Sequence, residues 1–345
     1  MRHRSFVAFS ASSWLIVAGV SMAPSCVAGE GGEKAASSPE AADASWTAPR
    51  TPWGDPDFQG IWTTNEMHGV PLERPAELAG RDALTAEEAA ARREQTTQRT
   101  VTAEGIGNYD RAFRDTALGF TKQGLSTHAS LVVDPPDGRL PPLTAEAQTR
   151  REQQRARRGQ RPADWTDLGT WGRCITRGAL TIVEPSGYNN GVQIVQGPGY
   201  VAIQKEMIHE TRVVPLDGRP HVSSNLKLWS GDARGRWEGE TLVIEVTNFD
   251  GRGPLFGASR NARLVERFTR LSPEQLEYRF TVEDPTIWTR PWTGSMTMSY
   301  DPGQYELVEY ACHEANYSMT NTLSAARAEE KAEQHGKGQR KPAGR

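Results

Sequence analysis

The stretch Leu276-Glu277-Tyr278-Arg279-Phe280-Thr281-Val282-Glu283 alternates without interruption between apolar and polar side chains. Successive side chains of a β-strand point to opposite faces, so this period of two places all the apolar side chains on one face. An amphipathic helix would instead repeat its apolar residues every three or four positions. The stretch therefore predicts a half-buried β-strand.

The same alternation recurs upstream at 242–246 and downstream at 296–300, and turn-forming residues at 237–240 precede the first of these runs. Further strands are expected at 193–195, 200–214 and 305–312. With roughly eight short strands and few helices between them, this part must bury its apolar face by closing on itself or by packing as two sheets. We expect a mainly β fold, an antiparallel barrel of the lipocalin-like kind, with a β-sandwich as the alternative.

The part of the chain before these strands is less regular. Ile61-Trp62 and 131–133 indicate short strands, while Thr85-Ala86-Glu87-Glu88 and Thr144 have the capping residues that begin helices. Changes in composition divide the chain into five sections. These are a signal peptide at 1–28, a disordered linker at 29–50, an irregular, partly helical section packed on the barrel at 51–174, an antiparallel β domain at 175–320, and a C-terminal helix with a basic tail at 321–345.

The N-terminus has the form of a secretory signal peptide. Basic residues within Met1-Arg2-His3-Arg4 precede a mostly apolar run at 6–22, and small residues lead to a cleavage point after Ala28. Serines interrupt this run, which is short of the ~20 apolar residues that a membrane span needs, so no anchor is expected after cleavage. Lipidation of Cys26 is the alternative, although Ala23-Pro24-Ser25 does not match a Leu-type lipobox. We expect a periplasmic or secreted protein.

Removal of the signal peptide would leave two cysteines, Cys174 and Cys312. In an exported protein an isolated pair indicates a disulfide, which here would close a long loop and so restrict the unfolded chain. The competing interpretation makes Cys312 a nucleophile beside His313. Neighbours along a strand point to opposite faces, which argues against that role.

Charge and motifs exclude several classes of function. The 345 residues carry a formal net charge of −3, and the arginines are scattered among acidic residues, so nucleic-acid binding is not expected. The sequence has no G-x-S-x-G elbow, phosphate loop, dinucleotide fingerprint, C-x-x-C pair or haem-attachment motif. This argues against nucleotide cofactors and ordinary serine hydrolases, and no cofactor is expected apart from the metal alternative below.

Several blocks of the sequence are similar to those of a known family. They are 56–62 (PDFQGIW), 133–139 (VDPPDGR), 188–190 (YNN), 206–209 (EMIH), 215–221 (PLDGRPH), 235–243 (GRWEGETLV) and 310–317 (YACHEANY). In combination they resemble a family of uncharacterised exported proteins found in proteobacteria and acidobacteria. The resemblance covers most of the chain beyond about residue 51. It implies a bacterial source and a periplasmic or secreted destination, and it carries no catalytic assignment with it.

Glu206 and His209 have a spacing that would place both side chains on one face of a helix, as in some metal sites. The surrounding residues instead predict a strand, which separates the two and puts His209 on an apolar face with Val213. Glu210 and Arg212 fall on the opposite face with Glu206, where a solvated row of ion pairs is the structural interpretation.

An imidazole on an apolar face is either a buried structural group or a general acid/base at a cavity wall. In the catalytic interpretation His209 acts with Asp284 or Glu309 as its carboxylate partner and with His313 beside the cavity. Asp284 has the alternative role of capping a turn. A metal site formed by His209, His221 and His313 is a further alternative, since three converging imidazoles suit zinc or iron.

The segment 283–292 interrupts two clean strands with acids, tryptophans and an arginine. Trp288 and Trp292 would form the aromatic wall of an apolar ligand site, or alternatively cap the core with Arg290 stacked on one of them. The other predicted ligand-binding residues are Tyr188, Asn190, Arg234 and Met296. For Arg234 the structural alternative is an ion pair with Asp232.

Two functions of different class follow from this pattern. The first is an exported enzyme that acts on a hydrophobic or aromatic small molecule, such as a terpenoid, steroid or polyketide, by acid/base chemistry in the barrel cavity. Its reaction would be an isomerisation, elimination or hydrolysis. The second is a periplasmic binding or carrier protein for a hydrophobic ligand, without catalysis.

Cleavage after Ala28 and pairing of the two remaining cysteines make a joint prediction. The exported protein should have an intact mass that begins at Gly29, and it should react with a thiol reagent only after reduction. Mass spectrometry of the alkylated protein under non-reducing and reducing conditions measures both. A lipid-modified Cys26, or a thiol that reacts without reduction, would contradict it.

Overall fold

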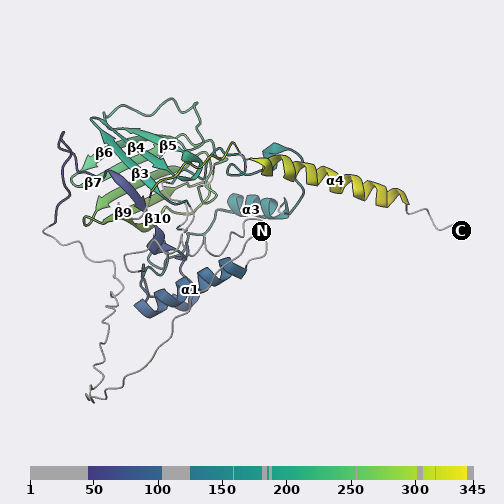
Figure 1. Cartoon of the computed structure of the whole chain (residues 1–345), viewed down its shortest axis with the longest axis horizontal. Helices are drawn as coiled ribbons and strands as arrows, with labels where there is room; N and C mark the ends of the chain where they lie inside the picture. Colours follow the sequence, from purple (N-terminus) through teal and green to yellow (C-terminus); the bar gives the residue numbers. More distant parts are fainter. Residues whose placement is uncertain are drawn as a thin grey trace, which may run out of the picture. The chain divides into compact units, whose positions relative to one another are not determined.

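The computed structural model describes residues 46–102, 125–157, 159–180, 185, 189–253, 255–300, 306–314 and 316–339. Its centre is one ten-stranded sheet that curls into a nearly closed barrel, and all its ladders are antiparallel (Figure 1). This confirms the predicted antiparallel barrel and rules out the alternative of a sandwich.

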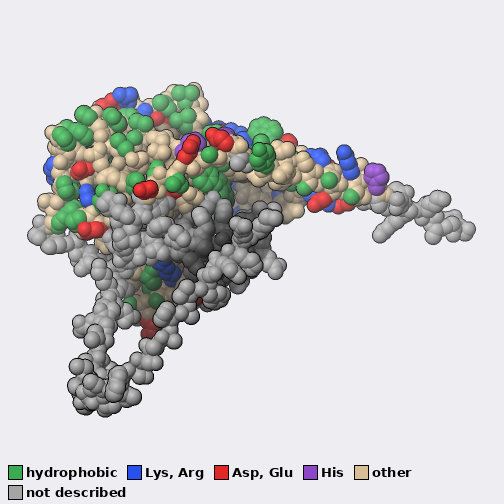
Figure 2. Space-filling model, in the orientation of Figure 1, with side chains coloured by type: hydrophobic (Ala, Val, Ile, Leu, Met, Phe, Trp, Pro, Cys, Tyr) green, Lys and Arg blue, Asp and Glu red, His purple; other side chains and the backbone are tan. Residues whose placement is uncertain are grey.

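On the face seen in Figure 2, acidic and basic side chains are interspersed.

The sheet is built from ten short strands. They are β1 Gly60–Thr63, β2 Val132–Asp134, β3 Val192–Gly197, β4 Tyr200–Lys205, β5 Thr211–Pro215, β6 Asp232–Glu238, β7 Thr241–Thr247, β8 Arg263–Arg270, β9 Gln275–Glu283 and β10 Trp292–Tyr300. Their order is β5-β4-β3-β1-β10-β9-β8-β7-β6, and β2 pairs with the first part of β10. The strands β5 and β6 therefore end the sheet and face each other across a seam.

The helices lie outside the sheet. They are α1 Ala86–Thr102, α3 Ala145–Arg157 and α4 Tyr317–Gln339, with 3-10 turns η1 Asn65–Met67, η2 Ala76–Leu78, η3 Trp165–Asp167 and η4 Met207–His209. The predicted capping box of α1 is confirmed: the Glu88 N–H donates to Thr85 Oγ1 at 3.2 Å, and the Thr85 N–H donates to Glu88 Oε2 at 2.8 Å. No described helix is both long enough and apolar enough to cross a bilayer.

Three features of the sheet differ from the sequence expectation. The section 51–174 contributes β1 and β2 to the barrel. The run 200–214 forms two strands, because the chain turns sharply at Ile208 and His209, which have φ of 66° and 46°. The described part of 305–312, residues 306–312, forms no strand, so the expected strand there is wrong.

The disulfide predicted between Cys174 and Cys312 is present. The two residues are 138 positions apart in the sequence, and their Cα atoms are 5.7 Å apart. The bond ties the segment before β3 to the segment before α4. It thereby closes the long loop that the sequence indicated.

The barrel interior is packed with aromatic rings. On β9 the alternating residues Leu276, Tyr278, Phe280 and Val282 are all completely buried, as the sequence predicts. The ring of Tyr278 lies 4.7 Å from that of Phe268 and 5.6 Å from that of Phe280, measured between centroids. Close ring contacts of this kind give the interior the density of a core.

Two glycines allow close approaches that the barrel needs. Gly294 on β10 lies directly opposite Phe280, and a Cβ atom there would come within 2.3 Å of the Phe280 ring. Gly235 on β6 faces the seam, and a Cβ atom there would lie 2.8 Å from Val214 of β5 and 2.6 Å from Leu216. Because glycine has no side chain, the Phe280 ring can lie over β10 at Gly294, and β5 can approach β6 at Gly235.

We expect Gly294→Ala to push the Phe280 ring out of its place and to lower the free energy of unfolding by about 1–3 kcal/mol, as overpacking of a core does. Urea unfolding measures the change. The control is Gly169→Ala, where the added Cβ meets nothing within 4 Å and φ is not positive; its effect should stay within about 0.5 kcal/mol. Equal effects of the two substitutions would contradict the packing argument.

Candidate functional site

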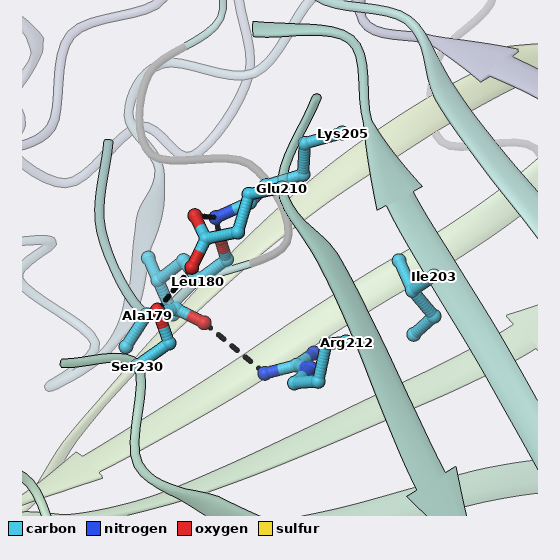
Figure 3. A pocket seen from close by; sticks show the side chains of 7 residues that line it. All are labelled: Ala179, Leu180, Ile203, Lys205, Glu210, Arg212 and Ser230. Carbon is cyan, nitrogen blue, oxygen red and sulfur yellow. Dashed lines mark hydrogen bonds and ion pairs between the residues drawn. The ribbon is translucent and has the colours of Figure 1, made fainter. Parts of the chain in front are cut away.

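Four ionisable side chains are buried together beside the seam, and Figure 3 draws Lys205, Glu210 and Arg212 among them. Lys205 ends β4, Glu210 precedes β5, Arg212 lies on β5 and Glu266 lies on β8. The exposed fractions of their side chains are 13%, 18%, 13% and 0%. Buried charges are costly unless they are paired, so a cluster of them inside a barrel requires an explanation.

The tight turn η4 brings Lys205 and Glu210 together. At the end of the β4–β5 hairpin the Lys205 N–H donates to the carbonyl of Glu210 at 2.9 Å, and Lys205 Nζ lies 2.7 Å from Glu210 Oε2. The positive φ values of Ile208 and His209 allow this turn to close with few residues. The hairpin therefore builds the ion pair locally.

The Glu210 carboxylate is held on several sides. Thr176 Oγ1 donates to Oε2 at 2.7 Å, and Ser230 Oγ donates to Oε1. Burial by itself would raise the pKa of this carboxyl, but the Lys205 ammonium and the hydrogen bonds from Lys205, Ser230 and Thr176 keep the pKa below its ordinary value. Glu210 is therefore ionised over the whole neutral range.

Burial acts on the lysine in the opposite sense. Desolvation lowers the pKa of Lys205 from its ordinary value, and the nearby Glu210 carboxylate offsets only part of this effect. Lys205 Nζ also donates to the carbonyl of Gly178 at 2.6 Å. Its amine consequently releases a proton more readily than an exposed lysine does.

The second ion pair crosses the barrel interior. Arg212 Nη2 lies 2.6 Å from Glu266 Oε2, although β5 and β8 are not neighbours in the sheet. Tyr278 donates its hydroxyl to Glu266 Oε1 at 2.6 Å. Arg212 also donates from Nη1 to the carbonyl of Ala179 at 3.1 Å. A bridged, hydrogen-bonded pair of this kind compensates the burial of both charges.

A small cavity lies between these groups. Its walls are Ala179, Leu180, Ile203, Lys205, Glu210, Arg212 and Ser230, as Figure 3 shows. The space open to the centre of a water molecule is about 10 Å³, about the room that one ordered water needs. The segment 176–180 forms one wall of the cavity with Ala179 and Leu180, and its residues Thr176, Gly178 and Ala179 hydrogen-bond to the charged cluster.

The predicted catalytic residues do not form one site. His209 is exposed, and its Nδ1 lies 2.9 Å from the carbonyl of Tyr310. Glu309 and His313 are exposed in the neighbouring stretch. Asp284 is buried elsewhere and caps a turn, accepting from the Ser259 N–H at 2.6 Å and from the Thr286 N–H at 3.0 Å. This is the structural alternative foreseen for Asp284.

The metal alternative finds no support in the described residues. No group of three or more His, Cys, Asp or Glu side chains among them is arranged to hold a metal ion. The partners of His221 are carboxylates: its Nδ1 lies 2.9 Å from Asp232 Oδ2 and its Nε2 lies 3.5 Å from Glu245 Oε1.

The predicted ligand-binding residues are also dispersed. Trp288, Trp292 and Met296 are buried in the core, with the two indole rings 5.7 Å apart. Arg234 pairs with Asp232 at 2.8 Å. Asn190 donates to Asn65 Oδ1 at 3.1 Å and to Thr64 Oγ1 at 3.3 Å, and Tyr188 lies outside the described residues. Arg290 forms an ion pair with Asp134, and none of the cation–π contacts among the described residues involves Arg290.

The charged cluster itself was missed by the sequence interpretation, which assigned Glu210 and Arg212 to a solvated face. One signal for it exists in the sequence. Glu266 lies between Leu264 and Phe268 on the apolar face of its strand, where a carboxylate needs a buried partner. The identity of that partner depends on how the barrel closes.

No protein-family model, curated protein or solved structure matches this chain. The resemblance of its sequence blocks to a family of exported bacterial proteins stays a prediction. The chemistry of the site is inferred from its own side chains.

Glu210 should make stability depend on pH. Because its folded-state pKa is below the ordinary 4.5, its contribution is complete above that value and is lost as the pH falls through the lower, folded-state pKa. Glu210→Gln should lower the free energy of unfolding by about 3–5 kcal/mol at neutral pH, because Lys205 loses its counter-ion. The free energy of unfolding of this variant should also fall less steeply than that of the wild type as the pH decreases.

Urea unfolding between pH 3 and 7 measures both effects. The control is Glu309→Gln, which removes an exposed carboxylate and should leave stability within about 0.5 kcal/mol. If Glu210→Gln behaved like this control, the buried pair would have no role in folding.

Proposed function

We propose that this chain is an exported enzyme whose buried Lys205–Glu210 pair carries out acid/base chemistry on a small molecule. The observation that carries the proposal is the buried ion pair at the cavity wall: Lys205 Nζ lies 2.7 Å from Glu210 Oε2, both residues line the cavity, and burial lowers the pKa of the amine. Ionisable groups with pKa values shifted by burial and a specific partner are typical of functional sites. The sequence supports export through its N-terminal signal and its cysteine pair.

The roles follow from the contacts. A lysine with a lowered pKa is a better proton donor when protonated and is available as a base nearer to neutral pH. Glu210 orients the amine and balances the positive charge of its protonated form. Thr176 and Ser230 hold the carboxylate in place for this role. Arg212 supplies a fixed positive charge in the same cavity, where negative charge on a substrate oxygen would develop.

These roles suit proton transfer next to a carbonyl group. The base removes a proton from the carbon beside the carbonyl, the electron pair moves onto the carbonyl oxygen, and the proton returns at the same or another carbon. Isomerisation and elimination both begin with this step. The apolar walls formed by Ala179, Leu180 and Ile203 favour a substrate with a hydrocarbon body.

The size of the cavity limits how such a substrate enters. Pockets for drug-sized ligands measure roughly 300–1,000 Å³, so a terpenoid or steroid does not fit the present space. We infer that segment 176–180 moves away on binding and gives up its hydrogen bonds to Lys205 and Arg212. The substrate would then accept hydrogen bonds from Lys205 and Arg212 in place of the carbonyls of this segment.

A carrier without catalysis remains the second candidate. It would need an apolar chamber, whereas the described part of the barrel interior is filled by rings such as Trp62, Phe268, Phe280 and Trp292. A carrier also has no use for a lysine with a lowered pKa. Both observations favour the enzyme.

The test follows exchange of α-protons of a small ketone, cyclohexanone, in D2O by mass spectrometry. We expect the wild type to accelerate exchange and Lys205→Met to reduce that acceleration by about 100-fold or more, the usual contribution of a positioned acid/base. The matched control is Lys227→Met, a lysine outside the cavity walls, which should keep full activity.

Circular dichroism and the intact disulfide establish that each variant is folded. A wild type that exchanges no faster than buffer would overturn the proposed proton abstraction. Equal rates for wild type and Lys205→Met would overturn the role of this lysine.

A further inference from the structure

Two tryptophans are unusually exposed on the segment that leads to the cavity. Trp165 and Trp171 leave 54% and 45% of their surfaces exposed. Large aromatic side chains are normally mostly buried, and exposed ones gather at binding surfaces. These two lie within seven positions of each other, one on η3 and one in the turn before Cys174.

Arginine side chains stack on these indoles. The guanidinium carbon of Arg177 lies 4.1 Å from the centre of the Trp171 ring. Arg173 lies 4.7 Å from the Trp165 ring and 5.7 Å from the Trp229 ring. Each exposed tryptophan is thus held by an arginine on one side, which fixes its orientation through a cation–π contact.

Arg252 also stacks on Trp229, with its guanidinium carbon 4.6 Å from the centre of the ring. Trp165, Arg173, Trp229 and Arg252 therefore contact one another in this order. Arg252 pairs with Asp250. By contrast, neither Arg173 nor Arg177 forms an ion pair with any residue of the described ranges. Two guanidinium groups therefore carry positive charge at this surface without a carboxylate partner among those residues.

The acidic residues nearest in sequence are engaged in local turns. Asp164 accepts from the Thr166 N–H at 2.7 Å, and Asp167 accepts from the Ala163 N–H at 2.7 Å. The Cys174–Cys312 disulfide anchors the segment between the two stacks, and Asn316 donates to the carbonyl of Gly172 at 2.9 Å. These two contacts restrain the chain at Gly172 and Cys174, between the two tryptophans and Arg177, which reduces the entropy lost on binding.

We propose that Trp165, Trp171, Arg173 and Arg177 form a binding site for an acidic polysaccharide, a polymer of sugar units that carry carboxylates. The C–H face of a pyranose ring packs on an exposed indole, and a guanidinium donates two hydrogen bonds to a carboxylate. Two Trp–Arg stacks on one segment match a ligand that repeats both features. A single small aromatic acid would satisfy one stack only.

The site is separate from the chemistry proposed at Lys205 and stands whether or not that chemistry occurs. Trp165, Trp171 and Arg173 precede segment 176–180 in the sequence, and Arg177 lies on it; Trp229 precedes the cavity residue Ser230. A polymer held here would bind next to the segment whose residues Ala179 and Leu180 line the cavity.

The experiment uses the full mature chain with its disulfide intact and measures binding of tetragalacturonate by isothermal titration calorimetry. The neutral comparison is cellotetraose. We expect binding of the acidic oligomer that weakens as salt is raised, and a dissociation constant at least ten-fold higher for Trp165→Ala and for Arg173→Gln. Trp171→Ala and Arg177→Gln test the second stack independently.

The matched controls are Tyr200→Ala, an aromatic residue exposed by 43% on β4, and Arg236→Gln, an exposed arginine on β6. Both should bind like the wild type. Equal affinity for cellotetraose would overturn the requirement for charge, and equal affinity for single-stranded DNA would overturn the assignment to sugars. Unchanged binding by the variants of both stacks would overturn the site.

Discussion

The ion pair between Arg212 and Glu266 is the interaction on which the rest of this structure depends. The two end strands of the sheet, β5 and β6, share no ladder, so hydrogen bonds between strands cannot hold the seam shut. Arg212 instead reaches from β5 across the interior to β8, where Tyr278 completes the carboxylate's hydrogen bonds. A buried pair that lost one partner would leave an uncompensated charge inside the barrel.

The same constraint organises the candidate site. Once Arg212 is drawn inward, the neighbouring Glu210 also faces the seam, and Lys205 meets it across the β4–β5 turn. These charges then hold segment 176–180, which lines the cavity, through its backbone carbonyls. The outer part of this region carries the two Trp–Arg stacks, and the disulfide anchors it. Structural charges and functional groups are thus parts of one network.

Much of the fold could be predicted because its signals are local. The alternation at β9 decides which side chains are buried, and the capping residues at Thr85 begin α1 where expected. The break within 200–214 could not be predicted, because Ile208 is a β-branched residue that rarely adopts a positive φ. The continuous strand expected there put His209 on an apolar face, whereas the turn leaves it exposed.

The sequence by itself determined the antiparallel β architecture, the faces of its main strands and the pairing of Cys174 with Cys312, because period, turn residues and cysteine count are properties of the chain alone. Only the tertiary structure decided which buried charges meet. Glu266 and Arg212 are far apart in the sequence and lie on strands that are not neighbours, so their contact exists only once the sheet has curled and brought β5 to the far side of the interior. Burial then sets the pKa of Lys205, because desolvation depends on everything packed around the amine rather than on the residues beside it in the chain.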